Sequence, residues 1–435
     1  MAGRRKTRIP LAVFLNGRLV GQLRRQASGA IDFQYAPQWL SWESAFPVSL
    51  SLPLREDRYI GDPVIAVFDN LLPDDDQIRK RLAARTDADG TDAFSLLAAV
   101  GRDCVGALQF LPEGEAPADI GKISGRPLAE PEIAAILGDL TQAPLGVTAE
   151  SEFRISLAGA QEKTALLRWK GRWHIPHGAT PTTHILKPEI GRLQSGLDLS
   201  DSVENEFFCL KLTKALGLPS ADVEIQRFGK QPVLVVARFD RRWTRDRRLI
   251  RLPQEDCCQA LSVAPTRKYE SEGGPGIRRI LELLKASDEP EIDRRLFLKA
   301  QILFWLLGAT DGHAKNFSIQ LLPGGRFRLA PLYDAMSAQP YVDAGQIRAS
   351  QYKLAMAVGD NRHYQINRIH LRHFEQAAAS AGMDKMVVAA IMNELKAAMP
   401  DAIENATANL PKGFPRRLAE QIAKGTGERL RLVQV

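Results

Sequence analysis

The stretch Ile302–Asp334 reads ILFWLLGATDGHAKNFSIQLLPGGRFRLAPLYD, and its order of elements decides the expected fold. The apolar run Ile302–Leu307 predicts the end of a buried helix, and the Gly-Gly turn at Pro323–Gly325 predicts a hairpin between two strands. Between them lies Ala309–Asn316, the densest group of polar residues in the chain. The sequence therefore predicts a polar loop between a buried helix and a hairpin.

Three side chains in this stretch have the spacing of a phosphoryl-transfer site. Asp311 and Asn316 are five positions apart, and Asp334 follows 18 positions after Asn316. In protein kinases a catalytic-loop Asp accepts the substrate hydroxyl proton, and an Asn five residues later and an Asp after a hairpin hold Mg²⁺. A turn residue or helix cap is the usual role of a lone Asp or Asn, but three residues in register favour a metal site, where oxygen ligands converge from two chain segments.

Kinase chemistry also needs a turn that covers the phosphates and a lysine on a strand, and both occur upstream in the expected order. Leu157–Lys163 (LAGAQEK) is a small-residue turn between predicted strands, and Lys187 ends the apolar strand His184–Lys187. Either feature alone is weak, because such a turn is usually only a hairpin and a strand-end lysine is usually solvated. The order of turn, lysine, acidic helix, strand, catalytic loop and metal Asp is what makes the set specific.

These residues belong to longer segments that closely resemble the HipA family, the serine/threonine kinase toxins of bacterial type II toxin–antitoxin modules. The segments are FRISLAGAQEKTALL, PTTHILKPE, ENEFFCLKLTKALGL, RFDRRW, RLPQEDCCQAL, KYESEGGPGI, FWLLGATDGHAKNFS, LYDAMSA and KLAMAVG. The resemblance covers nearly the whole chain, including FDNLLPD in the N-terminal region. It is weakest at the termini and between Glu113 and Glu150.

The resemblance implies a role for each matching position. The catalytic residue falls on Asp311, the metal ligands on Asn316 and Asp334, and the strand lysine on Lys187. The implied nucleotide contacts are Ala158, Gly159, Ala160, Gln161, Glu162, Lys163, Lys187, Ala237, Arg238, Phe239, His313, Ala314, Lys315, Asn316, Tyr333 and Asp334.

Two positions leave a question open. The family has an acidic residue at the first hinge position, where this chain has Ala237, so a side-chain contact is lost there although backbone contacts to adenine could survive. The resemblance implies Glu206 as the helix partner of Lys187, but Glu204 lies two positions away and could turn inward instead.

Ser156 lies immediately before the phosphate-covering turn, and the resemblance implies that it is an autophosphorylation site. A phosphoserine adds about −1.5 to −2 charges, so modification would repel the turn from the nucleotide and inactivate the enzyme. The plain alternative is a strand serine that faces solvent.

Composition and charge set the class of protein. A chain of 435 residues predicts about three domains, and 45% hydrophobic and 25% charged residues are typical of a globular protein. The net charge of +7 favours anionic partners, and four cysteines without CxxC spacing argue against a zinc or redox site. No apolar run approaches a membrane span, and no signal peptide follows the basic start of the chain, so we expect a cytoplasmic protein.

We expect an α+β fold: a two-lobed eukaryotic-like protein kinase with an extra N-terminal β-rich subdomain and an all-helical C-terminal lobe. The predicted boundaries are 1–127 for the N-terminal β-rich subdomain, 128–255 for a nucleotide-binding lobe with a small antiparallel sheet, and 256–435 for the helical lobe that carries the catalytic loop.

The expected activity is transfer of the ATP γ-phosphoryl group to a protein serine or threonine, with ATP and Mg²⁺ as cofactors. By resemblance, the target is glutamate-tRNA ligase and the outcome is growth arrest and persistence. By resemblance too, a small dimeric helix-turn-helix antitoxin (HipB-like) neutralises the kinase and holds it at operator DNA. One alternative is a kinase-fold corepressor that acts mainly in the antitoxin–DNA complex. Another is a small-molecule kinase of the aminoglycoside phosphotransferase type, against which only the family match argues.

Overall fold

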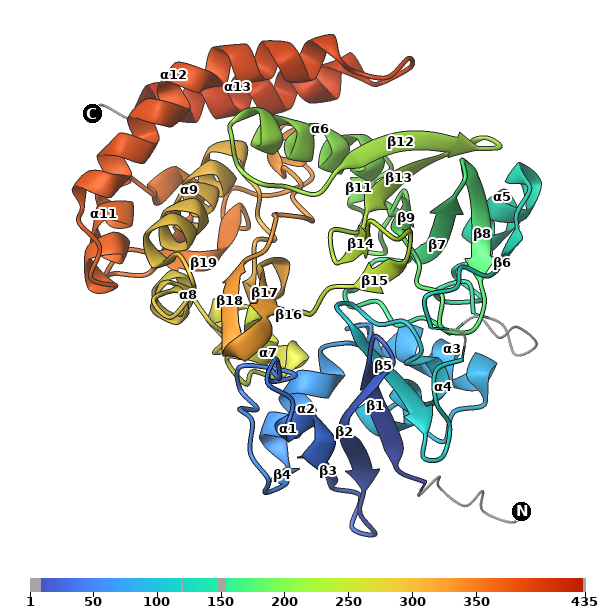
Figure 1. Cartoon of the computed structure of the whole chain (residues 1–435). Helices are drawn as coiled ribbons and strands as arrows, with labels where there is room; N and C mark the ends of the chain where they lie inside the picture. Colours follow the sequence, from blue (N-terminus) through green and yellow to red (C-terminus); the bar gives the residue numbers. More distant parts are fainter. Residues whose placement is uncertain (1–8, 119, 148–153, 433–435) are drawn as a thin grey trace.

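The N-terminal part of the chain (residues 11–112) is built on an antiparallel sheet (Figure 1). The computed structural model describes residues 9–118, 120–147 and 154–432, and within these ranges the sheet has the order β4-β3-β2-β1-β5. Its elements are β1 (Leu11–Leu15), β2 (Arg18–Arg25), β3 (Ile31–Tyr35), α1 (Pro37–Leu40), β4 (Tyr59–Ile60), α2 (Asp62–Asp69), α3 (Asp76–Thr86), α4 (Ala93–Val100) and β5 (Leu108–Pro112). An Asn-Gly pair between two apolar runs predicts a hairpin at Asn16-Gly17, and the structure confirms it: both turn residues have the positive φ (46° and 84°) that a two-residue turn requires.

The middle part (residues 125–251) carries a second antiparallel sheet, in the order β12-β13-β9-β7-β8-β6. Its elements are β6 (Gly125–Pro127), α5 (Glu130–Gly138), β7 (Thr164–Trp169), β8 (Arg172–Pro176), β9 (His184–Pro188), β10 (Gly191–Arg192), β11 (Asp198–Leu199), α6 (Ser202–Ala215), β12 (Val223–Phe228), β13 (Gln231–Ala237), β14 (Arg241–Trp243) and β15 (Leu249–Arg251). The small antiparallel sheet predicted here is confirmed. The quoted segment FRISLAGAQEKTALL, which leads into β7, begins at Phe153, and that residue lies outside the described residues.

The C-terminal part (residues 254–432) is mainly helical. Its elements are β16 (Gln254–Asp256), α7 (Cys257–Ala260), α8 (Ile277–Leu284), α9 (Pro290–Leu307), β17 (Ser318–Leu322), β18 (Arg326–Leu329), α10 (Gln339–Asp343), β19 (Lys353–Val358), β20 (His363–Gln365), α11 (Leu371–Ser380), α12 (Met386–Ala408) and α13 (Arg416–Leu432), with short 3₁₀ turns η1 (Pro265–Arg267), η2 (Glu270–Glu272), η3 (Ala314–Asn316), η4 (Pro323–Gly325) and η5 (Ile366–Arg368).

The expected α+β class is confirmed, but the C-terminal lobe is not all-helical. It contains a sheet in the order β16-β17-β18 and a β19-β20 pair. The β17–β18 hairpin is the one predicted at the Gly-Gly turn. Strand β16 has three residues and β19 is an apolar run buried over most of its length, and neither shows the alternating pattern that identifies a strand in sequence.

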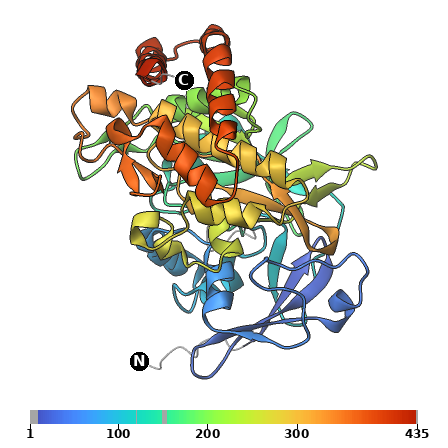
Figure 2. The same ribbon diagram turned by 90° about the vertical axis from the view of Figure 1, so that its left-hand side faces the viewer.

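The three parts pack around one continuous apolar core. The core includes Phe33 and Phe68 of the N-terminal part, Phe208 of helix α6, and Phe304 and Phe317 beside the polar loop. Figures 1 and 2 show the N-terminal sheet beneath the other two parts and the α12–α13 pair lying over α6. Among the described residues, no helix is long and apolar enough to cross a membrane. The predicted domain boundaries stay a prediction.

Candidate active site

Helix α9 ends at Gly308, where the polar loop begins. Gly308 has a φ of 69°, and a Cβ atom there would lie 1.8 Å from the hydroxyl of Tyr352, so only glycine fits. The backbone N–H of Ala309 donates to the carbonyl of Phe304 at 2.8 Å and closes the helix end. The buried helix therefore delivers residues 309–316 to a defined place.

Asn316 joins the two segments that carry the predicted catalytic and metal-binding residues. Its Nδ2 donates to the backbone carbonyl of Asp311 at 2.8 Å and to that of Asp334 at 3.4 Å. The β17–β18 hairpin supplies the reversal that brings Asp334 back to the loop. The structure thus brings Asp311, Asn316 and Asp334 together, and the amide oxygen of Asn316 is the atom that can bind a cation.

Lys187 connects the middle part to this group. Its ammonium nitrogen lies 2.8 and 3.0 Å from the two carboxylate oxygens of Glu206 on α6, and 2.9 Å from Oδ1 of Asp334. Of the two glutamates left open by the sequence, Glu206 is therefore the one that pairs with Lys187. Glu204 instead borders a surface pocket with Arg227 and other residues of β12 and the α12–α13 loop.

Burial and charge act in opposite directions on this ion-paired set. Burial alone lowers the pKa of Lys187, but Asp334 and Glu206 outweigh it and hold that pKa above its usual value. Burial raises the pKa of Asp334, but Lys187 and Lys163 hold it well below the usual range. Asp334 is therefore an ionised carboxylate, the form that binds a divalent cation.

The predicted phosphate-covering turn, Ala158–Lys163, folds over its own lysine. Gly159 has a φ of 105°, and a Cβ atom there would lie 2.5 Å from Nζ of Lys163, which donates to the carbonyl of Ala158. Burial, aided by Lys187, lowers the pKa of Lys163 to about 8. Gln161 donates to the carbonyl of Pro188 at 3.0 Å, which attaches the turn to the end of the strand that carries Lys187.

Glu162 and Ala160 are the remaining residues of the turn. Glu162 forms an ion pair of 2.7 Å with Arg81 of helix α3, and Ala160 is exposed. The N-terminal part therefore holds the outer side of the turn.

In the predicted hinge Ala237–Phe239, two backbone N–H groups are already hydrogen-bonded within the protein. The backbone N–H of Ala237 donates to Asp222 and that of Arg238 donates to Thr183, at 2.8 and 2.9 Å. Contacts to adenine through these N–H groups would require both bonds to open. The carbonyl groups of the hinge and the ring of Phe239 are the groups that remain for a base.

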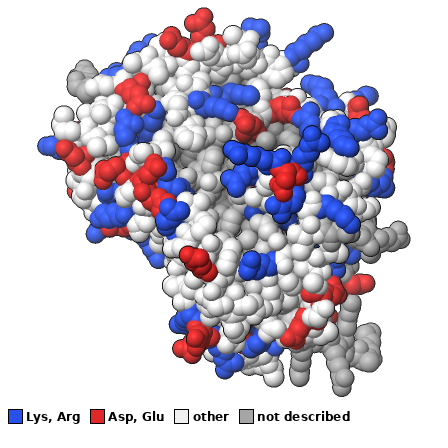
Figure 3. Space-filling model, in the orientation of Figure 1, with Lys and Arg blue, Asp and Glu red and all other residues white. Residues whose placement is uncertain are grey.

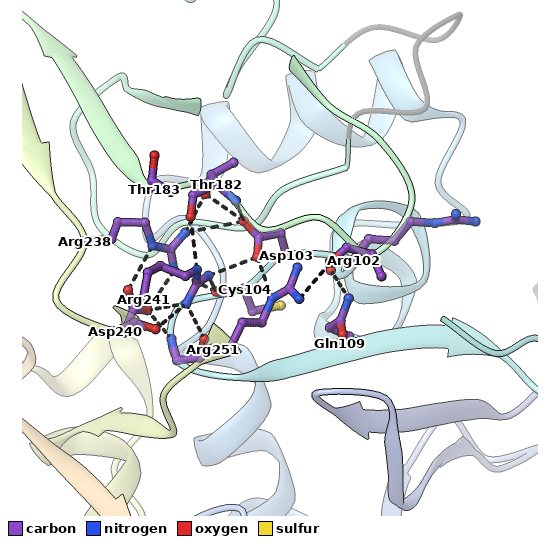
Figure 4. Close-up of polar contacts among 12 residues, drawn as sticks. Arg102, Asp103, Cys104, Gln109, Thr182, Thr183, Arg238, Asp240, Arg241 and Arg251 are labelled. Carbon is purple, nitrogen blue, oxygen red and sulfur yellow. Dashed lines mark hydrogen bonds and ion pairs between the residues drawn. The ribbon is translucent and has the colours of Figure 1, made fainter. Parts of the chain in front are cut away.

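The side chain of Arg238 belongs to a buried ionic cluster, shown in Figure 4, which sequence reasoning missed. Asp103 of the N-terminal part pairs with Arg241 at 2.9 Å and with Arg251 at 2.8 Å, and Asp240 pairs with Arg238 at 2.8 Å. All five side chains are at most 5% exposed. The charged residues of the segment RFDRRW are visible in the sequence, but only the fold reveals that two of its arginines pair with Asp103. This pairing connects the hinge to the N-terminal part.

Tyr269 is a second residue that sequence reasoning missed. Its hydroxyl donates to Oδ1 of Asp311 at 2.5 Å, and its ring lies edge-on to His313 with 4.9 Å between centroids. Burial lowers the pKa of His313, so this imidazole is neutral near pH 7. The Tyr269 hydroxyl thus occupies one carboxylate oxygen of the predicted catalytic residue.

Lys315 lies in the polar loop 309–316 but contacts the N-terminal part. Its Nζ is 2.6 Å from Oδ1 of Asp74, and Lys268 pairs with the other carboxylate oxygen of Asp74 at 2.9 Å. Asp74 and Lys268 were not identified from the sequence, although Asp74 ends the quoted segment FDNLLPD.

Tyr333 and Ala314 complete the predicted set. The Tyr333 hydroxyl donates to the carbonyl of Lys315 at 2.7 Å, and its ring lies 5.8 Å from that of Phe239. Ala314 is buried, and its N–H donates to the carbonyl of Lys268 at 3.4 Å. Phe239 and Tyr333 thus form an aromatic pair that spans the hinge and the segment of Asp334.

Ser156 does not face solvent. It is 0% exposed, its hydroxyl donates to the carbonyl of Leu71 at 2.7 Å, and its backbone N–H donates to that of Asp103 at 3.0 Å. The alternative of an exposed strand serine is excluded. A kinase can reach this hydroxyl only after the segment before the turn has left its place.

Comparisons with known proteins agree on one family. The HipA N-terminal domain matches residues 11–111, and the HipA-like C-terminal domain matches residues 155–403. A protein of Sinorhizobium fredii described as a putative kinase is 38% identical over 353 residues, 80% of each chain. The serine/threonine-protein kinase toxin HipA of Shewanella oneidensis is 27% identical over 416 residues, 93% of this chain and 90% of that one. A chain of the solved Shewanella oneidensis complex of HipA, HipB and operator DNA superposes with a TM-score of 0.80 at 26% identity, covering 97% of both chains.

Proposed function

The chain belongs to the HipA family of serine/threonine-protein kinase toxins, and on this premise we propose that it transfers the ATP γ-phosphoryl group to a protein serine or threonine. One observation carries the proposal: Lys187 is ion-paired with both Glu206 and Asp334, and Asn316 links Asp334 to Asp311. A lysine on a strand, a helix glutamate and a metal-binding Asp in contact are the parts that a protein kinase assembles for catalysis.

Asp311 would orient the substrate hydroxyl and accept its proton. The carboxylate already accepts a hydrogen bond from the Tyr269 hydroxyl, so it can accept one from a serine or threonine in the same position. Tyr269 would leave Asp311 when the substrate binds. Lys187 would bind the phosphates in place of one of its carboxylate partners.

The donor set fits Mg²⁺. Asp334 offers an ionised carboxylate and Asn316 an amide oxygen, and Mg²⁺ is usually held by one or two such groups together with substrate phosphates and water. Within the described ranges, no group of three or more His, Cys, Asp or Glu side chains forms a dedicated metal cage. When bound there, the ion would neutralise charge on the phosphates. Asp334 and Asn316 would fix its position.

The remaining predicted residues would hold the nucleotide. The Ala158–Lys163 turn would cover the phosphates, with the ammonium group of Lys163 able to donate to them. The aromatic pair of Phe239 and Tyr333 would contact the base, supported by the hinge carbonyls of Ala237 and Arg238. His313, Ala314 and Lys315 would line the side of the site next to Asp311.

Autophosphorylation at Ser156 would switch the enzyme off. The serine hydroxyl is wholly buried against Leu71, and a phosphate of about −1.5 to −2 charges could not return to that place without a large desolvation cost. The turn that follows Ser156 would therefore stay away from the nucleotide. Such a displacement would inactivate the enzyme without any change in Asp311 or Asp334.

The partners follow from the family. The solved Shewanella oneidensis neighbour contains HipB and operator DNA, and we extend to this chain a small dimeric helix-turn-helix antitoxin that neutralises it at operator DNA. The net charge of +7 is compatible with such a complex, and Figure 3 shows Lys and Arg side chains gathered on the upper right of one face. Glutamate-tRNA ligase is the proposed protein target, and growth arrest with persistence is the proposed outcome.

Incubation with γ-labelled ATP and Mg²⁺ tests the proposed activity. The purified chain is incubated alone and with a cell extract, and the labelled bands are identified by mass spectrometry. We expect label on the chain itself and on one protein of the extract, and none with the Asp311→Asn variant. Label on a small molecule and on no protein would contradict the protein-kinase assignment.

A further inference from the structure

Asp74 reaches the kinase site from outside the two kinase lobes. It lies between helices α2 and α3 of the N-terminal part, yet its two carboxylate oxygens pair with Lys315 at 2.6 Å and with Lys268 at 2.9 Å. Lys315 directly precedes Asn316, and Lys268 directly precedes Tyr269. One carboxylate therefore contacts the neighbours of two residues that bond to Asp311.

The same short segment also holds the phosphate-covering turn. The backbone N–H of Asp74 donates to the carbonyl of Gly159 at 3.1 Å, and Pro73 and Gly159 form a parallel bridge. Three residues earlier, the carbonyl of Leu71 accepts the bond from Ser156. The segment 70–74 is thus in contact with the Ala158–Lys163 turn and, through Asp74, with the loop that contains Lys315.

The two ion pairs of Asp74 are buried. The side chains of Asp74, Lys315 and Lys268 are 9%, 4% and 15% exposed, so each charge has lost most of its water. A buried charge persists only when it is paired. Burial raises the pKa of Asp74, but Lys315 and Lys268 outweigh this effect and lower it to about 2, which keeps the carboxylate ionised at neutral pH.

We propose that Asp74 is a positioning residue of the kinase site: by holding Lys315 and Lys268 in place, it fixes the loop in which Asn316 is bonded to Asp311. This inference rests on the proposed function. It makes the N-terminal part a component of the active site. Asp74 also places a negative charge beside two lysines that would attract a triphosphate. Loss of this charge should therefore lower turnover without weakening nucleotide binding.

Asp74→Asn tests the proposal, with Asp69→Asn as the matched control. Asp69 lies at the end of α2 and pairs with Arg79 at 2.7 Å, inside the N-terminal part. We expect Asp74→Asn to lower kcat about tenfold or more, because a charge-assisted contact to each lysine is lost. The KM for Mg·ATP should stay equal or fall, because a competing anion has been removed. Asp69→Asn should change neither constant.

Asp74→Glu and thermal unfolding separate positioning from folding. Glutamate keeps the charge, so it should retain more kcat than asparagine does, and both variants should be folded at the assay temperature. The inference would be overturned, and the proposed function left intact, if Asp74→Asn kept the kcat of the parent or if its KM for Mg·ATP rose as much as its kcat fell. Equal losses of kcat in Asp74→Asn and Asp74→Glu would overturn it too. Absence of transfer by the parent protein would instead overturn the proposed function, and the inference with it.

Discussion

The ammonium group of Lys187 lies 2.9 Å from the Asp334 carboxylate, which is 147 residues further along the chain. The contact joins the end of β9 in the middle part to the segment that follows the β17–β18 hairpin. Glu206 holds the same ammonium group from helix α6 at 2.8 Å. One cation therefore lies between a carboxylate of its own part of the chain and a carboxylate of the C-terminal part.

Glu206→Gln should reduce catalysis strongly, whereas Glu204→Gln should not. Of the two glutamates, only Glu206 contacts Lys187, and loss of a charge-assisted contact costs about 1.5–3 kcal/mol, or roughly 10- to 100-fold in kcat/KM. Steady-state kinetics of both variants with a phosphate acceptor measure the difference. Equal losses in the two variants would mean that Lys187 does not depend on Glu206.

Asp311→Asn should abolish phosphoryl transfer and leave nucleotide binding largely intact. A general base contributes about 10²- to 10⁴-fold in rate, while ATP is held by other groups. Autophosphorylation and calorimetric binding of Mg·ATP are measured on the same preparation. Near-normal autophosphorylation by this variant would refute the role of Asp311.

Asp334→Ala and Asn316→Ala should weaken binding of Mg·ATP more than binding of metal-free ATP. Their oxygen atoms should act through the cation and not through the adenine. Calorimetric titrations with Mg²⁺ and with a chelator give the two affinities for each variant. If both affinities fell by the same factor, metal ligation by these residues would be excluded.

Purified enzyme given Mg·ATP should gain one phosphate at Ser156 and then lose ATP binding. The hydroxyl must first leave its bond to Leu71, so limited proteolysis within residues 157–163 should become faster as the phosphate accumulates. Ser156→Ala should gain no phosphate there. Mass spectrometry locates the modification, and a Ser156-phosphorylated protein that still binds ATP normally would disprove the switch.

A small dimeric partner encoded beside this chain should bind it, and the complex should bind operator DNA with strong salt dependence. Neutralisation of DNA phosphates releases counterions, so affinity should fall steeply between 50 and 200 mM salt, roughly 10³-fold or more if at least six phosphates are contacted. Co-purification from the native host and titrations at several salt concentrations test this. The absence of both a partner and an adjacent helix-turn-helix gene would favour a solitary kinase.

Local features of the fold can be predicted from the sequence. The Asn16-Gly17 hairpin, the buried helix α9 and the β17–β18 hairpin each depend on a few consecutive residues, whose turn propensity and apolar pattern are visible in the sequence. The five-residue spacing of Asp311 and Asn316 is likewise a property of one loop. These features were predicted because neighbouring residues alone account for them.

The choice between Glu204 and Glu206 could not be made in this way. The two residues lie about 200° apart around a helix, so only one can face Lys187. Helix α6 is buried on nearly every side, and without an exposed polar stripe its sequence does not reveal which face points inward. The packing of β9 and the C-terminal part against α6 makes the choice.

The partners of Arg238, Ser156 and Lys315 also depend on long-range packing. Asp74 is 241 residues from Lys315, and Leu71 is 85 residues from Ser156. No local pattern relates residues so far apart, because their contact exists only once the N-terminal sheet has packed beneath both kinase lobes. The sequence was sufficient to predict a candidate set of catalytic and metal-binding groups, which the fold brings together. Which charges meet was decided only by the tertiary structure, because a buried ion has lost its water and is stable only beside an opposite charge that the fold places there.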